Sequence, residues 1–301
     1  MDNLGKSNNA AVKIWLFVFC SLIFLTVMKA DPDLFGHLKF GQTILDGRSI
    51  PKTDLFSYTA YGAQWINHEW LSEVIFWTVY SNFHAVGLIV LRLFLGLLFC
   101  FFLWKIVSSD NFYGSAALFL YIFFIVVPFW HFRPHIFTFL FFVIMLYLLK
   151  NEKYFLVPPL FIFWQNLHGG FVAGLAYLFI YAVFSDKRKK LLLISAVSLL
   201  LTFVNPYGWK LWHGIFRAFF NPYTRALIED WRPSGFLETE FIGYWVLVFF
   251  YCFMTAVNFK KIRINEFAAS AAFLFLSFSS VRHIPVFALV CAPQLRKPFV
   301  S

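Results

Sequence analysis

Charged side chains are scarce in this sequence. Asp, Glu, Lys and Arg make up 13% of the 301 residues, hydrophobic residues make up 60%, and the mean hydropathy is +0.71. A soluble domain of this length needs many more polar side chains to cover its surface. The shortage therefore excludes a soluble globular protein, and the 44 phenylalanines suit helices that face lipid.

Cysteine is scarce as well, and the four cysteines have no paired spacing. Each lies within or beside an apolar run, as a small core residue does: Cys20, Cys100, Cys252 and Cys291. The sequence therefore predicts neither a disulfide framework nor a cysteine metal motif.

A small-x-small cleavage site is missing from the first apolar run, which covers about residues 12–28. The run continues directly into the charged stretch from Lys29 to Asp33. We therefore expect an uncleaved first span in place of a signal peptide.

Apolar runs recur along the whole chain, separated by short charged or Pro/Gly-bearing stretches. A helix needs about 20 apolar residues to cross a bilayer, and fewer if its ends snorkel. The sequence therefore predicts an all-α, polytopic integral membrane protein of about ten transmembrane helices, in a single membrane domain over residues 1–301. The predicted spans are residues 12–30, 85–107, 112–130, 135–150, 154–167, 170–185, 190–205, 241–259, 265–281 and 284–295.

The remaining apolar run, residues 69–83, decides the topology. If this run crosses the membrane, the basic cluster at 187–190 falls outside, whereas a run that lies flat in the interface puts every basic cluster in the cytoplasm. We therefore predict an interfacial helix over 69–83 and cytoplasmic N- and C-termini. The net charge of +10 comes from these clusters and does not indicate a nucleic-acid partner.

This topology divides the chain into five parts: a first span over 12–30, a first outer loop with interfacial helices over 31–84, spans two to seven over 85–205, a second outer loop over 206–240, and spans eight to ten with a cytoplasmic tail over 241–301. It also places all eight histidines on the outer side. They are His37, His68, His84, His131, His135, His168, His213 and His283. Histidine plays no part in the positive-inside rule, so we expect the functional site on the outer face.

The first outer loop opens with two aspartates. Asp31 before Pro32 predicts a helix N-cap with proline at the first position, and the helix is expected to run to about Asp46. Asp33 and His37 stand at i and i+4, so they share one face and can pair. We expect Asp31 or Asp33 to act as a general base tuned by His37 or by an arginine. The structural alternative is a cap and a first-turn carboxylate that complements the helix dipole.

His68 and Glu69 precede the interfacial helix. The second histidine of a zincin motif, four residues further on, is missing, so a metallopeptidase is not predicted. The pair could act in catalysis or contribute to a divalent-metal site with Asp31 and Asp33, or it could only cap the helix. The cofactor therefore stays open between none and a divalent metal.

Three short outer turns carry polar groups next to proline or glycine. Any one of these side chains can snorkel at a span end. Together the turns predict a basic pocket for an anionic group such as a phosphate, and the amphipathic 206–240 loop adds another cation. The predicted substrate-binding residues are Arg133, His135, Asn166, His168, Arg225, Arg282 and His283.

Several of these motifs resemble, in order, a widespread and poorly characterised group of bacterial multi-span proteins. The motifs are Asp31-Pro-Asp-Leu-Phe-Gly-His-Leu, Asp54-Leu-Phe-Ser-Tyr-Thr, Trp65-Ile-Asn-His-Glu-Trp-Leu, Arg133-Pro-His, Asn166-Leu-His-Gly-Gly, Asn205-Pro-Tyr-Gly and Arg282-His-Ile-Pro. The layout of that group is similar to the GT-C superfamily of polyprenyl-phosphate-sugar glycosyltransferases. Those enzymes place prolines where this chain has Asn67-His68-Glu69, and they are usually longer.

The resemblance implies a function on the outer face of a bacterial inner membrane. Asp31 or Asp33 would match the first-loop acidic residue that acts on the acceptor, and Arg133, Arg225, Arg282 and His283 are candidates for binding the donor phosphate. The expected reaction is sugar transfer from a lipid-linked donor in the bilayer to an unidentified acceptor. The alternatives are a transporter or flippase for a lipid-linked or anionic substrate, for which Arg92 is the only ionisable residue near mid-span, and a non-enzymatic membrane protein.

Overall fold

The computed structural model describes residues 2–26, 31–236 and 238–296, without the side chains of residues 2–8, 10, 224 and 225. Within these ranges the chain is helical, and its β-pairing is limited to one isolated bridge between Thr53 and Gln64. The predicted all-α class is confirmed. The α-helices are α1 (Asp2–Thr26), α2 (Pro32–Gly47), α3 (Trp70–Val107), α4 (Phe112–Val126), α5 (His135–Lys150), α6 (Val157–Leu167), α7 (Phe171–Val183), α8 (Arg188–Leu201), α9 (Lys210–Phe220), α10 (Pro222–Leu227), α11 (Ile242–Asn258), α12 (Ile264–Ser279) and α13 (Ile284–Leu295).

Among the residues that the structure describes, three helical segments are long and apolar enough to cross a membrane. They are Trp70–Val107, Phe112–Phe129 and Thr239–Lys261, and five further apolar helices have 10–17 residues. A helix of about 15 residues is only about 22 Å long, less than the roughly 30 Å of a hydrocarbon core. The number of spans and their orientation therefore stay predictions, while the helical membrane class has support from length and composition.

The outer surface of α11 has the character of a lipid-facing helix. Val246, Phe249, Phe253 and Val257 are each more than half exposed, and their spacing puts them on one face. Water disfavours such a stripe of large apolar side chains, whereas lipid tails do not. In contrast, α13 is buried on nearly every side and packs against α3, α4, α5, α11 and α12, so the predicted tenth span is the central helix of the bundle.

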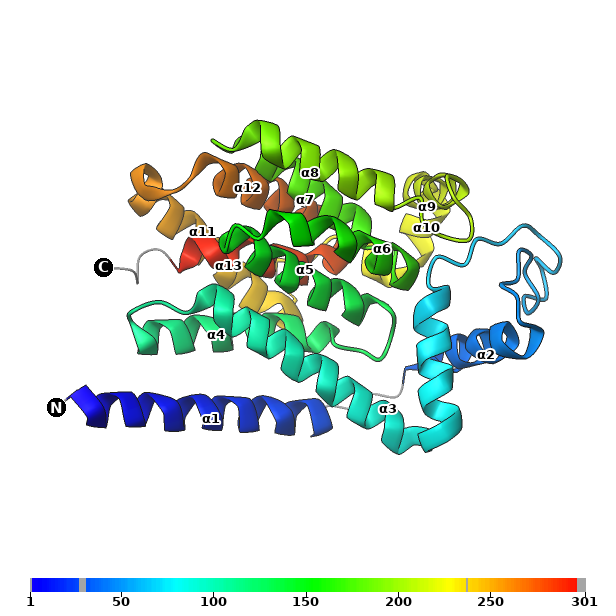
Figure 1. Cartoon of the computed structure of the whole chain (residues 1–301), viewed down its shortest axis with the longest axis horizontal. Helices are drawn as coiled ribbons and strands as arrows, with labels where there is room; N and C mark the ends of the chain where they lie inside the picture. Colours follow the sequence, from blue (N-terminus) through cyan, green and yellow to red (C-terminus); the bar gives the residue numbers. More distant parts are fainter. Residues whose placement is uncertain (1, 27–30, 237, 297–301) are drawn as a thin grey trace.

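Helix α3 consists of two arms that meet at a bend. His84 breaks the helical geometry with φ 52° and ψ −148°, which separates residues 70–83 from residues 85–107. The first arm runs across the end of the bundle, beside α2, and the second arm runs back along the bundle near α1 (Figure 1). The predicted helix over 69–83 therefore exists as a separate arm with a crosswise direction.

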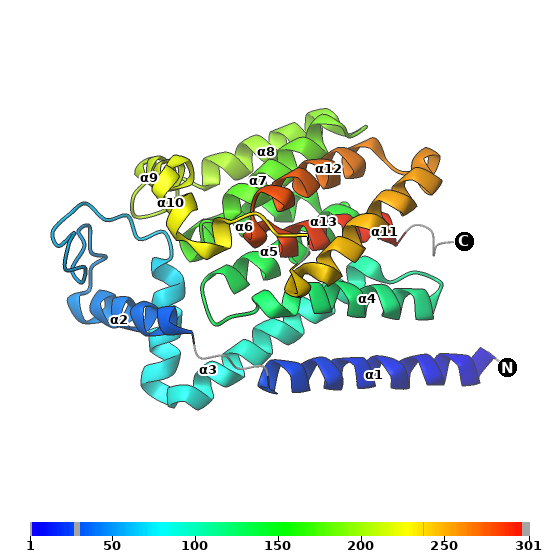
Figure 2. The same ribbon diagram turned by 180° about the vertical axis from the view of Figure 1, so that it is seen from behind.

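Two ends of the bundle differ in what they contain. We call the end with α2, residues 48–69, the first arm of α3, α9 and α10 the site end (Figures 1 and 2). The opposite end, with the start of α1 and the ends of α3, α5 and α13, is the basic end. Lys13 on α1 lies over the rings of Trp104 and Phe112, and Arg296 donates to the carbonyl of Ser108, which brings α1, the end of α3, the start of α4 and the end of α13 together there.

Helix α2 begins as the sequence predicts. Asp31 has an extended backbone and its side chain accepts a hydrogen bond from the Asp33 N–H at 3.1 Å, while Pro32 occupies the first turn. At the other end Gly47 is still helical, and Arg48 adopts the left-handed conformation with φ 47°. Gly41 allows α2 to touch the first arm of α3, because a Cβ at this position would collide with the carbonyl of Glu73.

Candidate functional site

A carboxylate–arginine cluster, consisting of Asp31, Asp33, Arg133 and Asp230, lies at the site end. Arg133 donates from Nε to Asp31 Oδ2. Its Nη1 is 3.1 Å from Asp33 Oδ2 and 3.9 Å from Asp230 Oδ2. One guanidinium therefore joins the start of α2, the turn before α5 and the 3₁₀ turn Glu229–Trp231.

The two aspartates of this cluster differ in exposure. Burial alone would raise the pKa of Asp31, but hydrogen bonds from Arg133 and from the Asp33 N–H outweigh burial and lower it. The Asp31 side chain is 6% exposed, whereas that of Asp33 is 57% exposed. Asp31 is thus an ionised, fully engaged anchor, and Asp33 is the accessible carboxylate.

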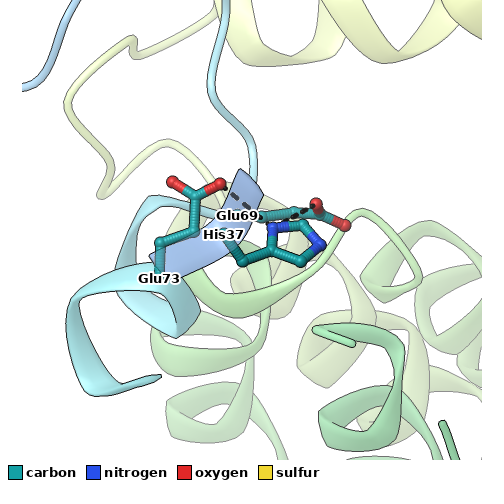
Figure 3. A group of neighbouring side chains, drawn as sticks. All are labelled: His37, Glu69 and Glu73. Carbon is teal, nitrogen blue, oxygen red and sulfur yellow. Dashed lines mark hydrogen bonds and ion pairs between the residues drawn. The ribbon is translucent and has the colours of Figure 1, made fainter. Parts of the chain in front are cut away.

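A histidine–glutamate cluster, consisting of His37, His68, Glu69, Glu73 and His168, is the second polar group at this end. His37 Nδ1 is 3.2 Å from Glu73 Oε1 and 4.0 Å from Glu69 Oε2, so the imidazole lies between the two carboxylates (Figure 3). The predicted pairing of His37 with Asp33 is wrong. Asp33 binds Arg133 at the first turn of α2, while His37, one turn further on, contacts the first arm of α3.

Burial and charge act in opposite directions on His37. Burial would lower its pKa, but the hydrogen bond to Glu73 and the negative charges of Glu69, Glu73 and Asp33 raise it above 6.5. The two carboxylates therefore stabilise the positive form of this imidazole relative to a free histidine.

His168 is held in one tautomer by its neighbours. Its Nδ1 accepts a hydrogen bond from the Gly170 N–H at 3.0 Å and lies 2.8 Å from Thr138 Oγ1. Thr138 Oγ1 in turn accepts from Trp164 Nε1. Burial lowers the pKa of His168 well below 6.5, so the ring is neutral and its proton is on Nε2, which lies 3.5 Å from Glu69 Oε1.

Three side chains meet the general requirement for a metal site. One ligand atom each from His37, Glu69 and Glu73 can be chosen so that all three atoms lie within 4.8 Å of one another. The predicted metal group of Asp31, Asp33, His68 and Glu69 is different, because both aspartates bind Arg133. The capping alternative for Glu69 is also wrong: its side chain makes no cap hydrogen bond, and its N–H donates to Asn67 Oδ1.

The predicted phosphate pocket is only partly present. His135 directs Nε2 to the carbonyl of Phe129 at 2.6 Å. Asn166 accepts from Trp70 Nε1 and donates to the carbonyl of Val204, so its amide joins α3 to the end of α8. These two side chains serve packing, and Arg133 is already shared among three carboxylates.

Among the described arginines of the pocket, Arg282 is the one without a carboxylate partner. Its guanidinium carbon lies 4.5 Å from the ring centroid of Trp231, and no hydrogen bond or ion pair joins it to a carboxylate among the residues that the structure describes. Asp230 and Glu69 act on it electrostatically from a greater distance. His283 lies with its ring centroid 6.4 Å from that of Trp231, and the side chain of Arg225 is outside the described residues.

Sequence reasoning did not assign roles to Glu73, Asp230 and Asn67. Glu73 follows Glu69 by four residues in a helix, and this spacing was a usable signal because it puts both carboxylates on one face. Asp230 gives no such signal, since it reaches Arg133 only through the folding of the 206–240 loop onto this end.

No family model, curated protein or solved structure matches this chain.

Proposed function

We propose that the site end is the active site of a membrane enzyme that transfers a sugar from a polyprenyl-phosphate donor to an acceptor hydroxyl. One observation carries the proposal: the segment Asp230–Trp231 contacts two guanidinium groups. The first, that of Arg133, holds the accessible carboxylate of Asp33, and the second, that of Arg282, has no carboxylate partner among the described residues. Arg133 links Asp33 to Asp230, and Arg282 stacks on Trp231. The resemblance to the GT-C layout, with an acidic residue directly after the first helix, supports the same reaction.

Asp33 takes the role of the base in this proposal. Its side chain is more than half exposed, and Arg133 fixes its position at the first turn of α2. Asp31 is the positioning residue, because it caps α2 and holds Arg133 from the buried side. General-base catalysis of this kind typically contributes about 10²- to 10⁴-fold in rate.

Arg282 takes the role of the phosphate ligand. A guanidinium can bind two phosphate oxygens at once, and stacking on Trp231 holds its plane in place. Hydrogen bonds from Ser280 Oγ to the Asp230 carbonyl and from the Val281 N–H to the Arg232 carbonyl fix the loop against the turn that carries Arg282. The cation is thus positioned before the donor binds.

The reaction is a displacement at the anomeric carbon of the sugar. Asp33 takes the proton of the acceptor hydroxyl, the acceptor oxygen forms a bond to the anomeric carbon, and the bond from that carbon to the phosphate oxygen breaks. Polyprenyl phosphate leaves with the electron pair, and Arg282 stabilises its negative charge.

Fewer observations favour the transporter alternative. Arg92, the ionisable residue near mid-span, is buried and donates from Nη2 to the carbonyl of Trp130 at 3.1 Å. Its guanidinium binds the turn before α5, which is a packing role.

A donor-release assay tests the proposal. Membranes that contain the protein, and that supply native acceptors, are given a panel of polyprenyl-phosphate sugars carrying labelled hexoses or pentoses. Free polyprenyl phosphate and labelled product are then measured. We expect release with one donor of the panel, a loss of about 10²-fold or more in Asp33→Asn, and a loss of similar size in Arg282→Gln.

Asp46→Asn is the matched control, because it makes the same change on the exposed far end of α2. It should leave the release rate unchanged. Equal rates in wild type, Asp33→Asn and Arg282→Gln would overturn the proposal, as would movement of an intact donor across proteoliposome membranes without release.

A further inference from the structure

We infer that His37, Glu69 and Glu73 bind one divalent transition-metal ion, with Zn²⁺ as the best match. Two elements supply the ligands: His37 comes from α2, and the two glutamates come from the start of α3. The inference rests on the geometry of these side chains and does not depend on the proposed sugar transfer.

The oxygens of each glutamate are divided between two tasks. Glu73 Oε2 accepts a hydrogen bond from the side-chain amide of Asn67, which leaves Oε1 for His37 Nδ1. Glu69 Oε1 faces the ring nitrogens of His168 and His68 at 3.5 and 3.6 Å, which leaves Oε2 on the side of His37. Glu73 is therefore held by an outer hydrogen bond at one oxygen, and Glu69 has two imidazole nitrogens near one oxygen. Each carboxylate presents its other oxygen toward His37, as metal ligands with second-shell neighbours do.

The outer shell is itself fixed. Because Gly170 donates to His168 Nδ1, the proton of the neutral ring is on Nε2, which faces Glu69 Oε1 at 3.5 Å and does not act as a metal ligand. Gly41 fixes the distance between α2 and α3 directly beside Glu73. This contact fixes the position of His37 along the axis of the first arm of α3.

The spacing suits a small cation. Ligand bonds of about 2.0–2.2 Å in a tetrahedral site put neighbouring ligand atoms roughly 3.3–3.6 Å apart. His37 Nδ1 is 3.2 Å from Glu73 Oε1 and 4.0 Å from Glu69 Oε2, so rotation of the Glu69 carboxylate closes the remaining gap (Figure 3). Three protein ligands would leave at least one position for water or a substrate oxygen.

Charge and donor type also favour a metal of this class. Glu73 is buried, and Arg133, a cation of the neighbouring cluster, is shared by three other carboxylates. Two carboxylates around His37 thus need a nearby positive charge, supplied either by a proton on His37 or by a metal ion. One imidazole nitrogen with two carboxylate oxygens suits Zn²⁺, whereas Mg²⁺ and Ca²⁺ prefer oxygen ligands alone.

Metal titration of the full chain tests the inference. Tag-free protein in detergent is stripped with a chelator, and Zn²⁺ binding is followed by calorimetry and elemental analysis, with Co²⁺ absorption as a coordination probe. We expect one tight site per chain and a metal-dependent rise in the thermal midpoint. Glu73→Gln and His37→Asn should each weaken binding by about 100-fold or more, and His168→Ala by roughly 10- to 100-fold.

His213→Asn is the matched control, since it removes an exposed histidine from α9 at the same end. It should leave affinity and stoichiometry unchanged. Thermal unfolding of the metal-free variants confirms that each is folded, and Glu69→Gln replaces any variant that is not.

The inference is wrong if wild type takes up no Zn²⁺ at stoichiometric concentrations, or if the ligand variants bind as tightly as His213→Asn. Binding is measured without donor or acceptor. A protein that binds the metal but releases no polyprenyl phosphate would therefore contradict only the proposed function, and the reverse result would contradict only the metal site.

Discussion

The ionisable side chains at the two ends of the bundle differ in their main partners: backbone carbonyls at the basic end and carboxylates at the site end. At the basic end Lys150 donates from Nζ to the carbonyls of Lys105 and Ile106, and Arg296 donates to the carbonyl of Ser108. These carbonyls belong to the end of α3, where the last turn of a helix leaves acceptors unsatisfied. At the site end His37 and Arg133 contact carboxylates of distant segments.

The difference separates structural charge from charge that is available for chemistry. A cation on a helix C-terminus satisfies backbone acceptors and the helix dipole, and this need exists in any helical protein. A cavity at the basic end is lined by charges of both signs, among them Arg263, Glu266 and Arg296. Among the described residues, the site end brings together the five carboxylates and three imidazoles of its two clusters and a guanidinium that has no carboxylate partner.

Removal of Arg133 should give the largest loss of stability. Arg133→Gln leaves the buried carboxylate of Asp31 without its cation, and breaking such a pair costs about 2 kcal/mol or more, with allowance for the partial exposure of the arginine. Chemical denaturation in detergent measures the change. Asp31→Asn keeps a good N-cap side chain and should cost less, because it removes the buried charge that needs Arg133. A smaller loss in Arg133→Gln than in Asp31→Asn would contradict this account.

The site end should also respond to pH in the neutral range. The folded-state pKa of His37 is raised above 6.5 by Glu73, Glu69 and Asp33, so its contribution to stability is complete below about 6.5 and is lost as the pH rises through the folded pKa. The thermal midpoint of chelator-treated protein should therefore fall from about pH 6 to about pH 8. His37→Asn should make the thermal midpoint less dependent on pH in this range. An unchanged pH dependence in that variant would show that another group causes the effect.

The smallest effect is expected for the surface pair between Glu152 and Lys187. The hydrogen bond between them lowers the pKa of Glu152 and raises the pKa of Lys187, so both stay charged across the neutral range. Both side chains are exposed, and such pairs contribute little. Glu152→Gln and Lys187→Gln should leave the thermal midpoint and its pH dependence unchanged, and a clear shift would show that this pair is more than a surface contact.

Local patterns predicted the parts of the site that depend on neighbouring residues. The start of α2 at Pro32, its cap at Asp31 and the separate helix after Glu69 are all present. The arm over 70–83 also has the crosswise direction expected of an interfacial helix (Figure 2). Each of these features is decided within about one helical turn, where capping and periodicity act.

The partners of the ionisable groups could not be predicted in the same way. His37 and Asp33 share a helical face, yet His37 contacts Glu73, 36 residues away, and Arg133 reaches Asp31 across 102 residues. These contacts depend on how α2 packs on α3 and how the turn before α5 meets α2. Helix spacing alone contains no information on that packing.

The sequence by itself determined the all-α class and the apolar helices that support a membrane protein, because apolar runs and caps are properties of short segments. Only the tertiary structure decided that Asp31 is buried, that Asp33 is exposed and that Arg282 has no carboxylate partner among the described residues. The physical reason is that an ion pair forms wherever desolvated charges of opposite sign meet, and the close approach at Gly41 and the folding of the 206–240 loop decide where that happens.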